Sequence, residues 1–247
     1  MDKVVSGVER ALAVIAVLLL PAWGTQYITP SGRADFSHLT NRSNPNGIRD
    51  SLAAKPEANF PANLAVVRIQ APKYRSHGAE SYADGDFSVV MVREIEEDSH
   101  FKRLQAMPKV AGVVPLNRLL IPPRVQGNEQ LREAAAKLQA DILLEYTVDT
   151  GFYDQQHSAP LSIISLGFLP TKNVRVSSTA AALLIDVRSG FIYGAAEDTQ
   201  RAEETASFWS TTAAVDETRR KTEKAAFESL IGKIEKMWAG LAGKYSA

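Results

Sequence analysis

The sequence contains no cysteine among its 247 residues, and it carries no excess of charge of either sign. The missing cysteine excludes disulfides, thiolate metal ligands, cysteine nucleophiles and cysteine-held iron–sulfur clusters. Lysine plus arginine and aspartate plus glutamate each number 28, so no net charge draws the chain to nucleic acid or to anionic lipid. No basic patch of any length occurs either. We therefore expect no nucleic-acid partner.

Motifs that accompany common enzyme chemistries are also missing. The chain has no Walker-type glycine-rich loop before a lysine, no G-x-G-x-x-G and no G-x-S-x-G nucleophile elbow. None of its histidines lies three or four residues from another, so we expect all four to be solvated surface or loop residues. They are His38, His77, His100 and His157. The sequence predicts no cofactor, no metal site and no catalytic residue.

The N-terminal region carries a short apolar run. Residues 11–20 read ALAVIAVLLL, and Pro21 ends the run. A membrane-spanning helix needs roughly 20 apolar residues, whereas about half that length is typical of a signal peptide. We therefore predict that residues 1–24 are an export segment and that the chain is periplasmic, or tethered to the membrane and facing the periplasm. The alternative is a core helix that happens to begin the chain.

The residues after this run suggest two kinds of processing. Ala22 and Gly24 are small residues that a signal peptidase could accept for a cut before Thr25. The stretch LPAWGT, residues 20–25, also resembles a bacterial lipoprotein box in which Trp23 occupies the position of the lipidated cysteine. Without that thiol no diacylglycerol can be attached. Membrane association would then depend on the N-terminal segment itself.

The remainder is expected to be a linker followed by one domain. Residues 25–62 have a composition typical of loops, apart from a short helix expected at 48–54. They predict a linker that lets the domain stand off a membrane, or that packs loosely along the membrane. Residues 63–247 predict a single α/β domain. Its expected strands are 64–70, 87–93, 110–116, 141–148, 174–188 and 191–197, and its expected helices are 94–107, one capped by Asn128, and 216–244.

The order of these elements predicts a layered domain in which helices cover a mixed sheet. The helical crossovers require parallel strands, and Ser189-Gly190 between two β-rich runs predicts an antiparallel hairpin. The last helix is amphipathic and mixes glutamate with lysine on its polar face, so we expect it to pack on the sheet rather than on lipid. Its apolar stripe comprises Phe227, Leu230, Ile231, Ile234, Met237, Trp238 and Leu241.

Two stretches give the second half of the chain a family resemblance. A helix runs directly into a strand at residues 136–144, AKLQADILL, and residues 183–194, LLIDVRSGFIYG, form the hairpin before the final helix. This pattern, over residues 60–245, resembles curli-assembly (CsgG-type) lipoproteins and related small envelope lipoproteins. Residues 24–30 are similar to the segment after the lipid-bearing cysteine in uncharacterised proteobacterial lipoproteins. The resemblance implies an envelope location and a non-catalytic assembly role, but not a secretion pore.

Two apolar features could contact a partner. Residues 161–169, LSIISLGFL, favour a buried or edge strand, and the alternative is a hairpin arm or exposed patch. Strict alternation, which a transmembrane hairpin needs, is broken there. Phe208 and Trp209 lie in a polar stretch before the last helix and are a candidate partner contact, unless they fold onto the sheet. The sequence leaves open whether the chain forms a homo-oligomer.

We thus expect a non-enzymatic exported envelope protein that binds or scaffolds another, unidentified envelope protein. The alternative is a periplasmic hydrolase that uses carboxylates near Glu145 and Glu197. Glu145 and Asp149 share one face of a strand, and Asp154 and Asp186 are nearby in the predicted sheet. Acid–base work requires that such carboxylates meet in a concave pocket, with at least one of them buried. A solvated, charged sheet face would have the same sequence pattern.

Overall fold

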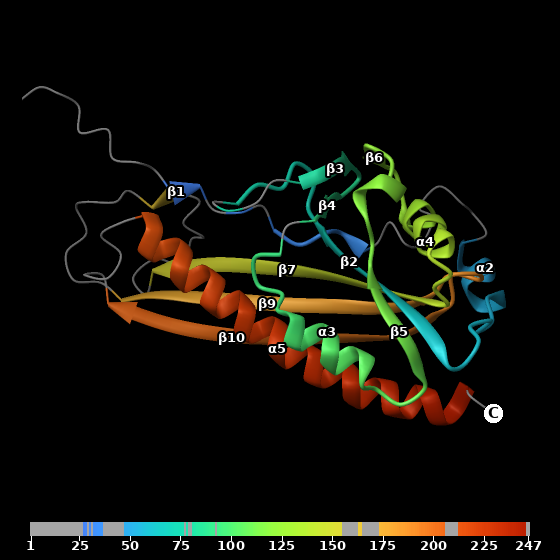
Figure 1. Ribbon diagram of the computed structural model, residues 1–247. Coiled ribbons are helices and arrows are strands. Elements are labelled where there is room, and N and C mark those ends of the chain that lie inside the picture. Colours follow the sequence, from blue (N-terminus) through green and yellow to red (C-terminus); the bar gives the residue numbers. More distant parts are fainter. Residues whose placement is uncertain are drawn as a thin grey trace, which may run out of the picture.

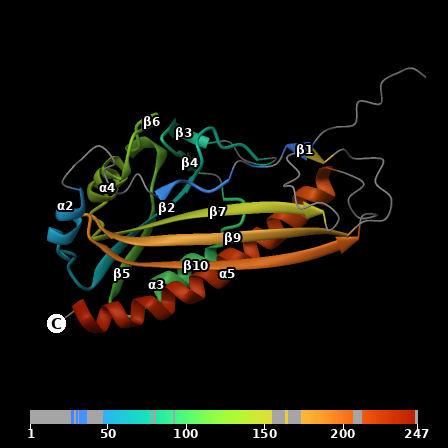
Figure 2. The same ribbon diagram turned by 180° about the vertical axis from the view of Figure 1, so that it is seen from behind.

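The computed structural model describes residues 27–28, 30, 32–36, 47–76, 78, 81–91, 93–154, 163–164, 173–205 and 212–245. A twisted mixed sheet forms the centre, with a long helix on one face and a shorter helix on part of the other (Figures 1 and 2). The helices are α2 (Gly47–Ala53), α3 (Asp98–Gln105), α4 (Asn128–Lys137) and α5 (Thr212–Tyr245), with a 3-10 turn at Arg118–Leu120. The layered α/β domain expected from the sequence is confirmed.

The main sheet has the strand order β10-β9-β7-β2-β4-β3-β6, and β5 pairs with β2 beside this row. Its strands are β2 (Ala62–Gln70), β3 (Ser81–Gly85), β4 (Ser88–Val90), β5 (Val110–Pro115), β6 (Arg124–Val125), β7 (Ile142–Asp154), β9 (Asn173–Asp186) and β10 (Ile192–Thr205). β2 is parallel to both β5 and β7, whereas β7, β9 and β10 are antiparallel neighbours. Both predictions about strand direction are confirmed.

The core consists of two layers, one on each face of the sheet. On one face, α5 and α3 cover β2, β7 and β9, and Trp238 and Phe227 of α5 belong to the same buried cluster as Leu144 and Leu184. The Trp238 indole N–H also donates to the carbonyl oxygen of Pro108 over 2.7 Å. On the other face, α4 packs on β2 and β7. The predicted inward packing of the last helix is therefore confirmed.

Short elements differ more from the sequence predictions. The strand predicted at residues 87–93 is β4 and covers only residues 88–90. The helix predicted at residues 94–107 is α3 and covers only residues 98–105. Asn128 is the first residue of α4 rather than its N-cap, which is Gly127. The physical reason is that the Asn128 side chain donates to the Glu145 carboxylate in the core instead of capping its own helix. Among the described helices, none is both long and apolar enough to cross a membrane.

The described part of the predicted linker is attached to the domain. The backbone N–H of Ala34 donates to the Thr147 hydroxyl over 2.9 Å. The N–H groups of Glu57 and Ala58 donate to Asp186 Oδ2 over 2.6 and 2.7 Å. These described residues are not loosely packed, because side-chain oxygens of Thr147 on β7 and Asp186 on β9 accept hydrogen bonds from their backbone. Residues 1–24 lie outside the described residues.

A separate two-stranded pair lies beyond the end of β7 (Figure 1). β1 (Tyr27–Ile28) pairs antiparallel with β8 (Ile163–Ile164). β8 is the only described part of the apolar stretch 161–169, so both interpretations of that stretch remain predictions.

Candidate functional site

The face of β9 and β10 opposite α5 is left open by the described helices. α5 packs against one face of these strands, and on the other face α4 contacts β7 and β6 (Figure 1). We call this surface the open face. Its side chains are half-buried or exposed, and they belong to Ser177, Thr179, Ala181 and Leu183 of β9 and to Ala195, Glu197, Thr199 and Arg201 of β10.

A recess of about 270 Å³ lies on the open face. Its floor consists of small or aliphatic side chains, and its rim carries one charge of each sign, since Arg33 and Glu197 are both exposed. The lining residues are Arg33, Phe36, Thr147, Ala181, Ala182, Leu183, Ala195, Ala196 and Glu197. Ligand pockets for small molecules usually measure about 300–1,000 Å³. The recess is therefore slightly smaller than a usual small-molecule pocket.

Gln70 at the end of β2 positions one wall of the recess, residues 32–36. Its amide donates to the carbonyl oxygen of Val148 over 2.8 Å and accepts from the N–H of the same residue over 2.9 Å. The side chain thus continues the pairing of β2 with β7 beyond Val67, the last residue of β2 that pairs with β7 through its backbone. The Thr147 hydroxyl donates to Gln70 Oε1 over 2.7 Å and accepts from Ala34. This chain of hydrogen bonds fixes the wall against β7.

Glu145 is fully buried, under α4, and does not line the recess. It accepts a hydrogen bond from the Asn128 side-chain amide. Burial raises the pKa of Glu145 to about 8, and the charge of Arg132 opposes that rise. The carboxyl group is therefore largely protonated at neutral pH.

The carboxylates of the hydrolase hypothesis do not meet in one pocket. Glu145 of β7 lies opposite Leu183 of β9, whereas Glu197 of β10 lies opposite Ala181, two residues away on β9. The whole width of β9 therefore separates the two carboxylates. Neighbouring strands are about 4.8 Å apart, so about 10 Å separates β7 from β10. Asp149 is exposed on β7, and the described part of Asp154 is its backbone. The geometric condition set for the hydrolase is not fulfilled.

Asp186 has a structural position at the hairpin turn. It accepts from the N–H groups of Arg188 and Ser189 and from the Tyr193 hydroxyl, in addition to the bonds from Glu57 and Ala58. Burial alone would raise its pKa, but these hydrogen bonds lower it overall. Asp186 is thus an ionised anchor for the turn and for the N-terminal segment.

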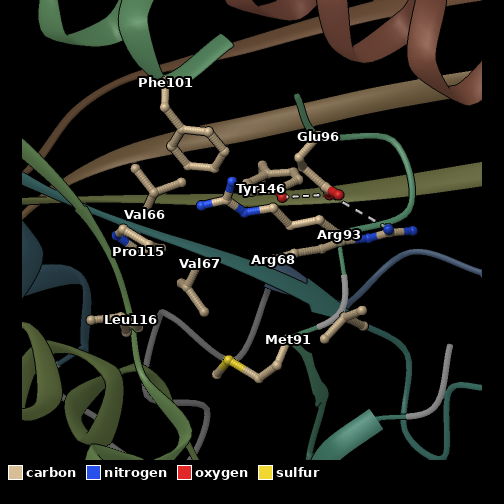
Figure 3. A pocket seen from close by; sticks show the side chains of 11 residues that line it. Val66, Val67, Arg68, Met91, Arg93, Glu96, Phe101, Pro115, Leu116 and Tyr146 are labelled. Carbon is tan, nitrogen blue, oxygen red and sulfur yellow. Dashed lines mark hydrogen bonds and ion pairs between the residues drawn. The ribbon is translucent and has the colours of Figure 1, made fainter. Parts of the chain in front are cut away.

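A second, smaller cavity of about 50 Å³ lies where β4 and β5 separate along the same edge of β2 (Figure 3). The buried Arg68 guanidinium points toward Glu96 and lies 3.5 Å from its carboxylate. The Tyr146 hydroxyl donates to that carboxylate over 2.6 Å, and Arg93 stacks on Phe101, 4.4 Å from the ring centre. A space of this size is large enough for water, which needs at least about 10–15 Å³ of such volume. It is part of the core's polar network.

The same network continues under the first turns of α5. The fully buried Arg219 guanidinium binds Asp216 over 2.9 Å, Glu223 over 2.8 Å and Glu94 over 3.2 Å. These bonds attach α5 to the segment between β4 and α3. This cluster was not predicted from the sequence. In the sequence, Asp216, Arg219 and Glu223 are spaced so that they share one face of a helix, the face that is buried in the structure. This spacing could have indicated the cluster.

Some predicted residues behave differently, and others lie outside the described part of the chain. The prediction that His100 is solvated is wrong, because its ring is buried against Phe227 with centres 5.1 Å apart. The ring accepts from the N–H of Glu97 over 2.9 Å, and its other nitrogen contacts Glu228. The remaining predicted positions lie outside the described residues: Ala22, Trp23, Gly24, Thr25, His38, His77, His157, Phe208 and Trp209. Within the described residues, no three acidic or histidine side chains group to hold a metal ion.

Comparison with known proteins gives no family. No family model matches the sequence, and no curated protein matches it. Protein XCC0632 from Xanthomonas campestris, of the family DUF330, is 12% identical with a TM-score of 0.37, covering 77% of this chain and 94% of that one. PelC from Paraburkholderia phytofirmans, solved as a dodecamer, is 14% identical with a TM-score of 0.27, covering 72% and 92%. Lipoprotein GNA1162 from Neisseria meningitidis is 13% identical with a TM-score of 0.28, covering 58% and 85%. These likenesses assign neither a family nor a function to the chain.

Proposed function

We propose that the chain is an exported cell-envelope protein that binds a partner protein on its open face and catalyses no reaction of its own. The export part of this proposal rests on the apolar run of residues 11–20, its end at Pro21, and the small residues before Thr25. With Trp23 at the position of a lipidated cysteine, the chain is either released into the periplasm or held at the membrane by its N-terminal segment.

The recess is the observation that carries the binding role. Its floor of Ala181, Leu183 and Ala195 is apolar, yet no described helix covers it. A domain of this architecture normally buries both faces of its sheet under other elements. Arg33 and Glu197 at the rim offer one charge of each sign, which suits a partner segment with an apolar side chain flanked by polar groups.

The hydrolase alternative has less support than the binding role. Its two named carboxylates are separated by a strand, one of them buried under α4 and the other exposed. Glu145, the carboxyl group with a raised pKa, contacts Asn128 rather than the recess. Glu145 and Glu197 therefore do not form a pair for acid–base work on one substrate.

Site-specific crosslinking tests the binding role. A photoreactive side chain placed at the exposed Glu197 should crosslink to a partner in the envelope of the producing cells. Ala181→Glu, which fills the floor with a charged side chain, should abolish that product. Ala225→Glu is the matched control, because Ala225 is exposed on α5, across the sheet from the recess. Equal crosslinking in the two variants would refute a role for the open face. The absence of any product from the chain that carries the photoreactive side chain without a second substitution would refute it as well.

A further inference from the structure

β10 is the edge strand of the main sheet. It spans 14 residues, and β9 is its one neighbour in the part of the chain that the structure describes. A long edge strand presents unpaired N–H and C=O groups that can pair with another chain, and proteins usually shorten, cover or charge such edges. Here Lys233 of α5 contacts Asp198 over 2.5 Å and donates to the carbonyl oxygen of Glu197 over 2.7 Å. This contact protects one point of the edge.

The side chains that β10 contributes to the open face have a symmetric charge pattern. Alternate residues of the strand lie on this face, and all of those from 195 to 203 are exposed. Glu197 and Arg201 have opposite charges and are equally far from Thr199, which lies between them. A strand with this pattern is complementary to a second copy of itself in the antiparallel direction.

We propose that two copies of the chain pair edge to edge through β10, antiparallel, with a two-fold axis at Thr199. A two-fold axis perpendicular to the sheet keeps both open faces on the same side, so residues of the open face lie opposite each other. Glu197 is then opposite Arg201 of the partner subunit, and the reverse pair forms on the other side of the axis. Opposite charges at directly facing positions stabilise a strand pair, whereas like charges destabilise it. An isologous dimer of this kind closes on itself.

Other registers are less favourable. An axis at Gln200 would place Glu197 opposite the partner's Glu203, and an axis at Glu197 or at Arg201 would place like charges on each other. An axis at Ala202 would pair Arg201 with Glu203. However, Arg175 already donates to Glu203 over 2.8 Å, and about half of the strand would lose its overlap. The Lys233 contact does not prevent the Thr199 register, because a carbonyl oxygen has two lone pairs.

The absence of native cysteine permits a sharp test with single-cysteine variants of the full chain. Facing residues of an antiparallel pair have Cα atoms about 4.5–5.5 Å apart, which lies within the range of about 4.4–6.8 Å that a disulfide needs. Thr199→Cys should therefore form a disulfide dimer under a mild oxidant. Glu197→Cys alone should not, because its two copies would lie four residues, about 14 Å, apart along the strands. An equimolar mixture of Glu197→Cys and Arg201→Cys chains should form the mixed dimer, and Ala225→Cys gives the level of random collision.

Charge reversal tests the register independently of oxidation. Glu197→Arg should place two like-charged pairs across the axis and raise the dimer dissociation constant about tenfold, as should Arg201→Glu. The double variant Glu197→Arg/Arg201→Glu restores both attractive pairs and should restore dimerisation. Size-exclusion chromatography with light scattering gives the mass of each species.

Glu197 belongs both to the rim of the recess and to the proposed strand pair. The Thr199 crosslink and the mass of the purified chain need no partner protein, so the pairing is tested separately from the binding role. A dimer with the Thr199 crosslink and charge-swap rescue supports the proposal. A monomeric chain, equal crosslinking of the Thr199→Cys and Ala225→Cys variants, or a double variant that stays monomeric would overturn it. If Glu197 crosslinks to a different protein while the chain is monomeric, the edge pairing is wrong and the binding role stands.

Discussion

The buried Glu145 should make the stability of the protein fall as pH rises through the neutral range. Its pKa is about 8 in the folded chain, against an ordinary value of 4.5. Below pH 4.5 the group is protonated in both states and contributes no pH dependence. Between pH 4.5 and 8 the unfolded chain has released the proton and the folded chain has kept it, so each pH unit lowers the free energy of unfolding by about 1.4 kcal/mol. Over the whole interval the loss is about 5 kcal/mol.

Glu145→Gln should remove this dependence. The amide keeps an oxygen that can accept from Asn128 but cannot ionise, so the variant and the unaltered protein should have similar stability near pH 4.5. Above that pH the variant should become progressively more stable than the unaltered protein, with the difference levelling off near pH 8. Urea unfolding at several pH values between 4.5 and 8.5 measures the free energy of unfolding for both proteins.

Glu133→Gln is the matched control, because it removes the same charge from an exposed position on α4, away from the recess and from β10. Its free energy of unfolding should stay within about 0.5 kcal/mol of the unaltered protein at every pH. If the difference between Glu145→Gln and the unaltered protein does not grow with pH, the carboxyl group is not held in its protonated form, and the reasoning from burial is wrong.

Three further changes test how the domain is held together. Arg219→Met leaves three buried carboxylates without their shared cation and should lower the free energy of unfolding by about 3–5 kcal/mol in urea; a loss below about 1 kcal/mol would contradict the role given to this cluster. Trp238→Ala empties a fully buried site between α5 and the sheet and should cost about 3–5 kcal/mol, seen as a lower Tm, whereas an unchanged Tm would mean that α5 does not pack as described. Asp186→Asn weakens the anchor of the N-terminal segment, so hydrogen exchange at the Glu57 and Ala58 amides should accelerate. Hydrogen bonding lowers the pKa of Asp186, so the stabilisation that its carboxylate gives the fold is complete above the ordinary pKa of 3.8 and is lost as pH falls through the lower pKa of the folded chain. The Asp186→Asn variant should therefore lose less stability in acid than the unaltered protein. Unchanged hydrogen exchange and unchanged acid sensitivity would argue against the anchor.

The strongest sequence predictions concerned elements with long, regular patterns. The apolar run that became β2, the Ser189-Gly190 turn and the stripe of α5 are each set by residues close together in the chain, so local patterning was sufficient. The short strands β3 and β6 were missed because two to five residues carry too little periodicity. The attachment of residues 57–58 was missed for a different reason. It depends on one carboxylate, Asp186, about 130 residues away in the chain, and no local pattern reports such a partner.

The candidate site was partly predictable. Strand alternation correctly places Glu145 and Asp149 on one face of β7. Their different surroundings depend on how far α4 extends over the sheet, since Glu145 is buried and Asp149 is exposed. The distance to Glu197 depends on the insertion of β9 between β7 and β10, which became clear only from the topology. The recess was missed because its wall comes from residues 32–36, a segment with loop-like composition.

The proposed role of the chain depends first on its export to the cell envelope. The most direct test is the intact mass of the chain after expression from its native N-terminus, measured separately in soluble periplasmic, membrane and cytoplasmic fractions. We predict either a periplasmic species that begins at Thr25 or a full-length species in the membrane fraction. A full-length species that is soluble in the cytoplasm would contradict export, and with it the proposed role in the envelope.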